Sequence, residues 1–402
     1  MKKKILALLL AAVMVLPLVA CGGNGGSTQN SENKGTENKG TENVGNTEEG
    51  GIALDGTWPE ETVKIGVLQF DSTAEQIIGI QEYFDYLAEY YNIEFVYSED
   101  LTDADSELNF IADCAAAGCK AVMGYYNVSL AEAAKKAADY GMYYWGGFGG
   151  DMDAYNEVKD NEYYLGGYTL GEAEYNAGKY MAEAVIAQGS KKVVFCSGGA
   201  AFGVEMFIDR KAGFMDTIAA AQADGNDIEV VYEIEGWPGT DAFAAAQTTA
   251  MGMDIDCIVS TFGVQMWFQQ VLSSDKKDDI KLVTIGEVND TYQSFVNDGL
   301  VTCIIYDSWE VVFGNIIPMV LNAVDGHKFV NADGSAPLFE VQRWSVTSKE
   351  AYNAIYDIHA NGEWVITAED IAELLFANNP DVTVEDFTKY YGEFSVDTVL
   401  GK

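Results

Sequence analysis

The chain has 402 residues, of which 63 are acidic and 23 are basic, so its formal net charge at pH 7 is −40. A surface this negative repels phosphate groups, which excludes nucleic acid as a partner. Roughly 340 residues follow the polar N-terminal region, which is more than one hydrophobic core usually supports, so two lobes are expected.

The first residues have the pattern of an export signal. Lysines at positions 2–4 precede an apolar run from Ile5 to Leu16, which is shorter than the roughly 20 residues that span a bilayer. The Leu-Val-Ala-Cys sequence that ends at Cys21 resembles the lipobox of bacterial lipoproteins. This resemblance implies that residues 1–20 are a signal peptide and that Cys21 carries a lipid; the alternative is an ordinary signal peptide with a chance cysteine.

The segment 21–56 consists mostly of Gly, Asn, Ser, Thr and Glu. With almost no bulky apolar residue it cannot bury enough surface to fold, so a disordered linker is expected. No later apolar run reaches transmembrane length. We therefore expect the mature protein to lie at the outer face of the cell membrane, tethered through Cys21.

From residue 62 onward, short apolar runs alternate with longer amphipathic stretches. This rhythm is typical of β-α-β units around parallel sheets. The expected strands are 63–68, 93–97, 121–124, 142–145, 192–196, 228–232, 257–260, 282–285, 301–306 and 339–344. The expected helices are 75–91, 105–117, 129–140, 170–187, 204–222, 240–251, 264–272, 309–322, 350–360 and 367–376. The sequence therefore predicts an α/β protein with two doubly wound parallel-sheet lobes.

Five cysteines remain besides Cys21, an odd number dispersed through apolar surroundings. This pattern is unlike a disulfide framework. The cysteines and the two histidines also lack the spacing of metal ligands. Neither a metal nor a cofactor is expected.

Three strings carry a resemblance to a known family. They are Val-Lys-Ile-Gly-Val at 63–67, Asp160-Asn161 ahead of Leu-Gly-Gly at 165–167, and Arg-Lys-Ala-Gly-Phe at 210–214. Together with the strand order and a leader and linker typical of Gram-positive receptors, these strings resemble the type I solute-binding proteins of bacterial ABC importers, in the ribose- and galactose-binding group. The resemblance covers residues 63–346.

The resemblance implies that three crossing segments join the lobes, near 160–161, 306–308 and 342–344. Lobe 1 would comprise 62–160 and 307–342, and lobe 2 would comprise 161–306 and 343–402, including a C-terminal extension after Ser348. It also implies a monomeric binding protein, not an enzyme, that captures a small polar ligand between its lobes and delivers it to an ABC permease. A carbohydrate is the first candidate for that ligand.

Ligands of such folds bind beyond the carboxyl ends of the strands, where aromatic faces and polar side chains meet them. In lobe 1 these loops offer Gln69, Phe70, Asp71, Tyr125, Tyr126, Trp145 and Phe148. In lobe 2 and at the second crossing they offer Trp237, Asp241, Phe262, Glu287 and Asp307. The resemblance adds Arg210, placed where the family has a sugar-binding arginine.

This set departs from the family in two ways. Phe262 stands where the family has Asn, and Gly146-Gly147 replaces an Asp-Arg pair, while Glu287 takes the place of an acid with a one-residue slip. The site is therefore more aromatic than that of a pentose or hexose receptor, which favours a larger glycoside or a flat ligand over ribose.

Four alternatives stay open on the sequence alone. The aromatic side chains could belong to the core, and Arg210 could form a surface pair with Asp209 or Asp216. The protein could be a receptor for a nucleoside or a signalling ligand. It could also be an extracellular glycosidase, although it has no nucleophile motif and a pair of catalytic carboxylates cannot be identified among 63 acids.

Overall fold

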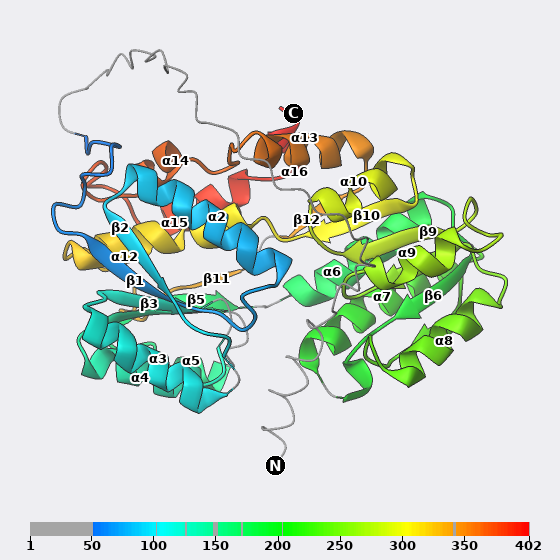
Figure 1. The fold of residues 1–402 in the computed structure, drawn as a ribbon, viewed down its shortest axis with the longest axis horizontal. Helices are drawn as coiled ribbons and strands as arrows, with labels where there is room; N and C mark the ends of the chain where they lie inside the picture. Colours follow the sequence, from blue (N-terminus) through cyan, green and yellow to red (C-terminus); the bar gives the residue numbers. More distant parts are fainter. Residues whose placement is uncertain are drawn as a thin grey trace, which may run out of the picture.

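The computed structural model describes residues 51–101, 103–124, 127–147, 152–169, 172–202, 204–340 and 343–401. The predicted signal peptide, the lipid on Cys21 and the linker up to residue 50 lie outside this range. Figure 1 shows two lobes side by side, each a sheet with helices on both faces. The predicted fold class is confirmed.

Lobe 1 contains a parallel sheet with the strand order β11-β5-β4-β3-β1-β2. Its strands are β1 (Val63–Leu68), β2 (Ile93–Tyr97), β3 (Ala121–Gly124), β4 (Tyr143–Gly146), β5 (Tyr164–Thr169) and β11 (Leu338–Glu340). Its helices are α2 (Glu75–Tyr90), α3 (Ala104–Ala117), α4 (Leu130–Asp139), α5 (Met152–Val158), α11 (Trp309–Gly314) and α12 (Ile316–Val324). Every residue of β3 is buried, as expected for a strand covered on both faces.

Lobe 2 repeats this plan with the strand order β12-β10-β9-β8-β6-β7, in which β12 alone runs antiparallel to its neighbour among the described strands. Its strands are β6 (Lys192–Cys196), β7 (Glu229–Ile234), β8 (Cys257–Ser260), β9 (Lys281–Ile285), β10 (Val301–Tyr306) and β12 (Trp344–Val346). Its helices are α6 (Ala173–Ala187), the short η1 (Ala200–Phe202), α7 (Glu205–Ala223), α8 (Asp241–Met251), α9 (Gln265–Leu272) and α10 (Asp290–Asn297).

Two glycines bring α6 and α7 unusually close together. A Cβ atom on Gly178 would lie 2.0 Å from the carbonyl oxygen of Arg210, and one on Gly213 would lie 1.9 Å from that of Tyr175. Only glycine permits such backbone contact. The close crossing places the first turn of α6 beside the middle of α7.

The lobe boundaries differ from those predicted. Residues 164–169 were assigned to lobe 2, but β5 pairs with β4 and β11 in lobe 1, so the first crossing follows Thr169. The strand carries two glycines: a Cβ atom on Gly166, whose φ is +119°, would lie 2.2 Å from the carbonyl oxygen of Pro337. Glycine within a strand weakens the sequence signal of that strand while allowing this close approach.

The expected strand 339–344 is two strands. The structure divides it into β11 in lobe 1 and β12 in lobe 2, so the third crossing runs between Glu340 and Trp344. The predicted linker also ends earlier than residue 56, because Ile52 and Leu54 pack on the core and the amide of Ile52 donates to Asn378 Oδ1 at 2.7 Å.

The C-terminal extension contacts both lobes, whereas the sequence assigned it to lobe 2 alone. It forms α13 (Lys349–Ala360), α14 (Ala368–Glu373), α15 (Val384–Glu393) and α16 (Val396–Val399). Helix α13 packs on α10 of lobe 2, α14 packs on α12 of lobe 1, and α16 packs on α13 and β12. Figure 1 shows these helices across the top of both lobes.

Candidate functional site

Loops at the carboxyl ends of the two sheets touch each other. Glu75, which begins α2 after β1, accepts hydrogen bonds from Asn289 Nδ2 at 2.8 Å and from Thr291 Oγ1 at 3.0 Å. Both partners belong to the start of α10, directly after β9. The strand ends at which ligands of such folds bind are therefore adjacent across the two lobes.

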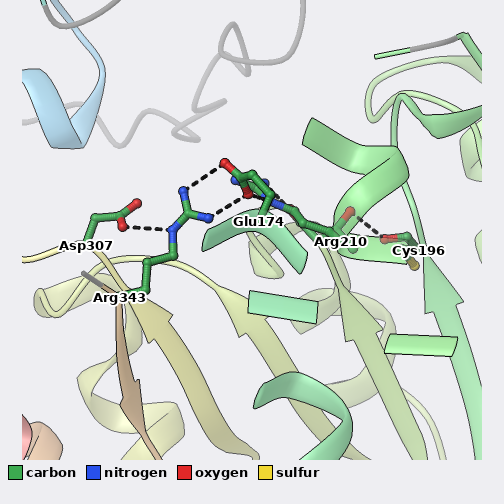
Figure 2. A network of polar contacts seen from close by, with 6 residues as sticks. Glu174, Cys196, Arg210, Asp307 and Arg343 are labelled. Carbon is green, nitrogen blue, oxygen red and sulfur yellow. Dashed lines mark hydrogen bonds and ion pairs between the residues drawn. The ribbon is translucent and has the colours of Figure 1, made fainter. Parts of the chain in front are cut away.

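A buried charge network lies where the chain passes between the lobes (Figure 2). Arg343 binds Glu174 with two hydrogen bonds of 2.6 and 3.0 Å, and its Nε donates to Asp307 at 2.9 Å. Arg210 Nε donates to the same carboxylate of Glu174, and its Nη1 donates to the carbonyl oxygen of Thr261 at 2.7 Å. We call Glu174, Arg210, Asp307 and Arg343 the hinge network.

The hinge network joins all three crossings. Glu174 lies in the first turn of α6 after the first crossing, Asp307 follows β10 in the second, and Arg343 precedes β12 in the third. The close approach of α6 and α7 delivers Arg210 to the same carboxylate. Arg210 and Arg343 are the only arginines in the sequence.

The ionisation of the hinge network follows from its pairing. Burial alone would raise the pKa of Glu174, but the charges of Arg210 and Arg343 lower it to about 2. Burial lowers the pKa of Arg210, whereas for Arg343 the carboxylates of Asp307 and Glu174 outweigh burial and raise the pKa. An arginine remains protonated in either case, so the network stays charged at neutral pH.

A second carboxyl at the lobe interface behaves in the opposite way. Glu287, which follows β9 in lobe 2, accepts a hydrogen bond of 2.9 Å from the indole nitrogen of Trp309 in α11. Burial, with smaller effects from Asp307 and Glu75, raises the pKa of Glu287 to about 8. At neutral pH this carboxyl is mostly protonated and can itself donate a hydrogen bond.

In lobe 1 the predicted polar residues serve the local backbone. Gln69 is buried and donates to the carbonyl oxygen of Ser98 at 2.6 Å, which ties the end of β1 to β2. Asp71 accepts hydrogen bonds from the amide and hydroxyl of Thr73 at 2.9 and 2.6 Å, forming a turn ahead of α2. Phe70 is half-buried against the core.

The predicted aromatic residues that are described lie in the core or partly against it. Trp145 has no exposed surface and stacks on Phe339 with ring centroids 5.9 Å apart. In lobe 2, Trp237 and Phe262 are 6% and 7% exposed and meet Phe207 edge-on. Their small exposed fractions leave little ring face for a ligand. Tyr125, Tyr126 and Phe148 lie outside the described residues.

Of the remaining predicted residues, Arg210, Glu287 and Asp307 come together at the interface of the lobes, while Asp241 is exposed in the first turn of α8. The alternative of a surface pair for Arg210 is wrong, because the guanidinium is buried on Glu174. Sequence reasoning missed Glu174, Trp309 and Arg343. The sequence has only two arginines, and Arg343 is one of them and lies within a predicted crossing; this could have identified it.

Each lobe contains a cavity among its described residues. One of about 50 Å³ lies under Gly147 and Tyr168 in lobe 1 and holds one or two water molecules at most. Another of about 200 Å³ lies in lobe 2 between the start of β10 and Tyr352 of α13.

Within the same residues, no cluster of three or more His, Cys, Asp or Glu side chains could hold a metal. The five described cysteines are free and buried. None of the helices that the structure describes is sufficiently long and apolar to cross a membrane.

No protein-family model matches the chain, and no curated protein does. Several solved structures, however, have a similar fold. An ABC transporter periplasmic solute-binding protein from Actinobacillus succinogenes, solved with bound D-allose, has a TM-score of 0.57 at 14% identity, covering 72% of this chain and 99% of that one.

Two further solved structures are similar. A substrate-binding protein of a sugar ABC transport system from Bordetella parapertussis has a TM-score of 0.53 at 15% identity, covering 71% of this chain and 89% of that one. A galactofuranose-binding protein has a TM-score of 0.53 at 14% identity, covering 74% and 99%. With its two sheets, its crossings and these likenesses, the chain has the fold of the type I periplasmic binding proteins.

Proposed function

We propose that this protein is an extracytoplasmic solute-binding protein that captures a small polar ligand between its lobes and delivers it to an ABC permease. The observation that carries the proposal is the contact of Glu75 with Asn289 and Thr291, which brings the carboxyl ends of both sheets together. Solute-binding proteins whose ligands are sugars share this fold. No catalytic step is part of the proposal.

The chemistry at the lobe interface favours a ligand rich in hydroxyl groups, with a carbohydrate as the first candidate. Asp307 is a half-buried acceptor, and the protonated carboxyl of Glu287 both accepts and donates. Because Arg210 is occupied by Glu174 and Thr261, it serves in this proposal to position the lobe interface. Tyr125, Tyr126 and Phe148 remain predicted ligand contacts.

A thermal-shift screen with sugars and nucleosides at about neutral pH tests the function. A ligand that binds only the folded protein stabilises it by RT ln(1 + [L]/Kd), about 2.7 kcal/mol at one hundred times Kd. We expect a sugar to raise the melting temperature without being consumed. A rise with nucleosides alone would favour the nucleoside receptor, and consumption of the sugar would favour the glycosidase.

A variant pair tests the site. Glu287→Gln keeps an acceptor for Trp309 but removes the titration, so sugar affinity should become independent of pH between about pH 6 and about pH 9. Glu132→Gln is the control, since Glu132 is exposed in α4, away from the interface. If both variants keep the pH dependence of the unmodified protein, Glu287 is not in the site.

We also propose that Cys21 carries a lipid and that residues 21–50 tether a monomer to the outer face of the membrane. The lipobox-like sequence supports this proposal. Cys21→Ser should release the protein into the medium, whereas the unmodified chain should sediment with membranes. Release of both proteins to the same extent would contradict the anchor.

A further inference from the structure

The C-terminal segment 349–401 makes two connections between the lobes in addition to the three crossings. It begins on lobe 2, where Tyr352 in α13 donates to the carbonyl oxygen of Asn289 at 2.5 Å, and Tyr356 donates to Asp290. It then passes to lobe 1 through residues 361–367 and returns to lobe 2 as α16, which packs on α13. We call this segment the strap.

The strap is firmly attached to lobe 1. Tyr83 of α2 and Tyr91, directly after that helix, donate to the carbonyl oxygens of Ile366 at 3.1 Å and of Ala368 at 2.6 Å. Phe387 is fully buried, and so is Leu375. Because exposing such apolar side chains to water is unfavourable, detaching the strap from lobe 1 is costly. Movement of one lobe against the other must therefore bend the connection between α13 and lobe 1.

One buried carboxylate lies at that connection. Glu310 of α11 is 1% exposed and contacts His359 Nε2, at the end of α13, at 2.6 Å. It also accepts hydrogen bonds from Ser308 Oγ in the second crossing at 2.8 Å and from the amide of Val365 in the strap at 3.4 Å. The same carboxylate thus joins the strap to the segment on which the lobes turn.

The charges around this pair make it titratable. Burial opposes a charge on either group, but each stabilises the charge of the other: the pKa of Glu310 is lowered and that of His359 is raised. Glu82 of α2 also favours the protonated imidazole. Tyr83 and Tyr306 also feel the charge of Glu310, and their hydroxyls remain protonated because burial raises their pKa values.

We propose that the strap holds the two lobes at a fixed angle and that the His359–Glu310 pair is its pH-dependent latch, closed while His359 is protonated and loosened when it is not. The latch would regulate opening of the ligand site between the lobes. This regulatory role rests on the proposed function, whereas the effect of the latch on the angle between the lobes does not. The angle itself is a property of the protein without ligand.

The test is the distance between the lobes, measured by electron paramagnetic resonance between spin labels on Glu132→Cys in lobe 1 and Asp224→Cys in lobe 2. Both positions are exposed, whereas the native cysteines of the described residues are buried. We expect a narrow distance distribution at about pH 5.5 and a broader one at about pH 8.5. His359→Gln should give the broad distribution at both values.

The other histidine of the chain supplies the matched control. His327 stacks on Phe376, a contact between the strap and lobe 1 only, so His327→Gln should keep the pH response. Glu310→Gln gives a second variant of the latch and should also abolish the response. A distribution that is independent of pH in the unmodified protein, or a response that survives in both latch variants, would overturn the proposal, whether or not any sugar binds.

Discussion

Two buried groups of charges of different character lie where the lobes meet, the hinge network and the His359–Glu310 latch. In the hinge network two arginines surround Glu174 and lower its pKa to about 2, so the link persists at every pH near neutrality. In the latch the cation is a histidine, with an ordinary pKa of 6.5 that Glu310 raises. The comparison shows that one interface can combine an ion pair that stays charged at all pH values near neutrality with one whose charge depends on pH.

Removal of Glu174 should have the largest effect on stability. Glu174→Ala leaves two buried guanidiniums without their shared carboxylate, which should lower the free energy of unfolding by about 3–5 kcal/mol. Urea denaturation measures this loss. Glu183→Ala is the control on the same helix, because that exposed carboxylate lies 3.8 Å from Lys179 and should matter little. Equal losses in the two variants would contradict a structural role for the hinge network.

The latch should contribute less, and its contribution should depend on pH. His359→Gln should destabilise the fold at about pH 5.5, by less than the roughly 3–5 kcal/mol of a fully buried pair, because a raised pKa in the folded state stabilises the fold fully below the ordinary value of 6.5. That stabilisation disappears as the pH rises through the raised pKa. Unfolding of the variant and the unmodified protein across this range checks the slope; a constant difference would show that the charge of His359 is irrelevant.

Replacing Glu287 should stabilise the fold, whereas replacing His359 should weaken it. The pKa of Glu287 is raised to about 8, so folding is favoured while the carboxyl is protonated and is opposed progressively as the pH rises from 4.5 toward 8. Glu287→Gln should therefore raise the melting temperature at about pH 8 by up to several degrees, because a pKa raised from 4.5 to about 8 corresponds to at most about 4 kcal/mol. A melting temperature that falls at every pH would show that the carboxyl is needed for packing, not merely tolerated.

The regular strands and helices were predictable because a sheet buried on both faces requires short apolar strands that alternate with longer amphipathic helices. Where backbone contact replaced side-chain packing, the pattern failed: β5 carries Gly166 and Gly167 against Pro337 and Gly146, and it was missed. The strap was assigned to one lobe because α13 begins there. Its partners on lobe 1, such as Tyr83 and Asn322, are distant in sequence, so a local sequence pattern cannot predict these contacts.

The candidate site was only partly predictable, and for a similar reason. Arg210 and Glu287 lie at the lobe interface, and their contact with a ligand stays a prediction. The partner of Arg210 is Glu174, 36 residues earlier, brought close by two glycines at a helix crossing. Trp145, Trp237 and Phe262 follow strands as predicted, yet they pack inward. An aromatic residue after a strand has the same sequence signature whether it covers the core or meets a ligand.

Exposed ion pairs within the lobes should contribute least to the stability of the protein. Lys64 pairs with Glu94 across β1 and β2 at 2.9 Å, and Lys192 pairs with Glu229 across the corresponding strands β6 and β7 of lobe 2. All four side chains are at least about a third exposed, so water and salt screen their attraction. Lys64→Gln and Lys192→Gln should each cost little measurable stability, and the cost should vanish in about 1 M salt. A loss as large as that of Glu174→Ala would show that exposure does not separate strong ion pairs from weak ones in this protein, and the contrast between its buried and exposed charges would need another cause.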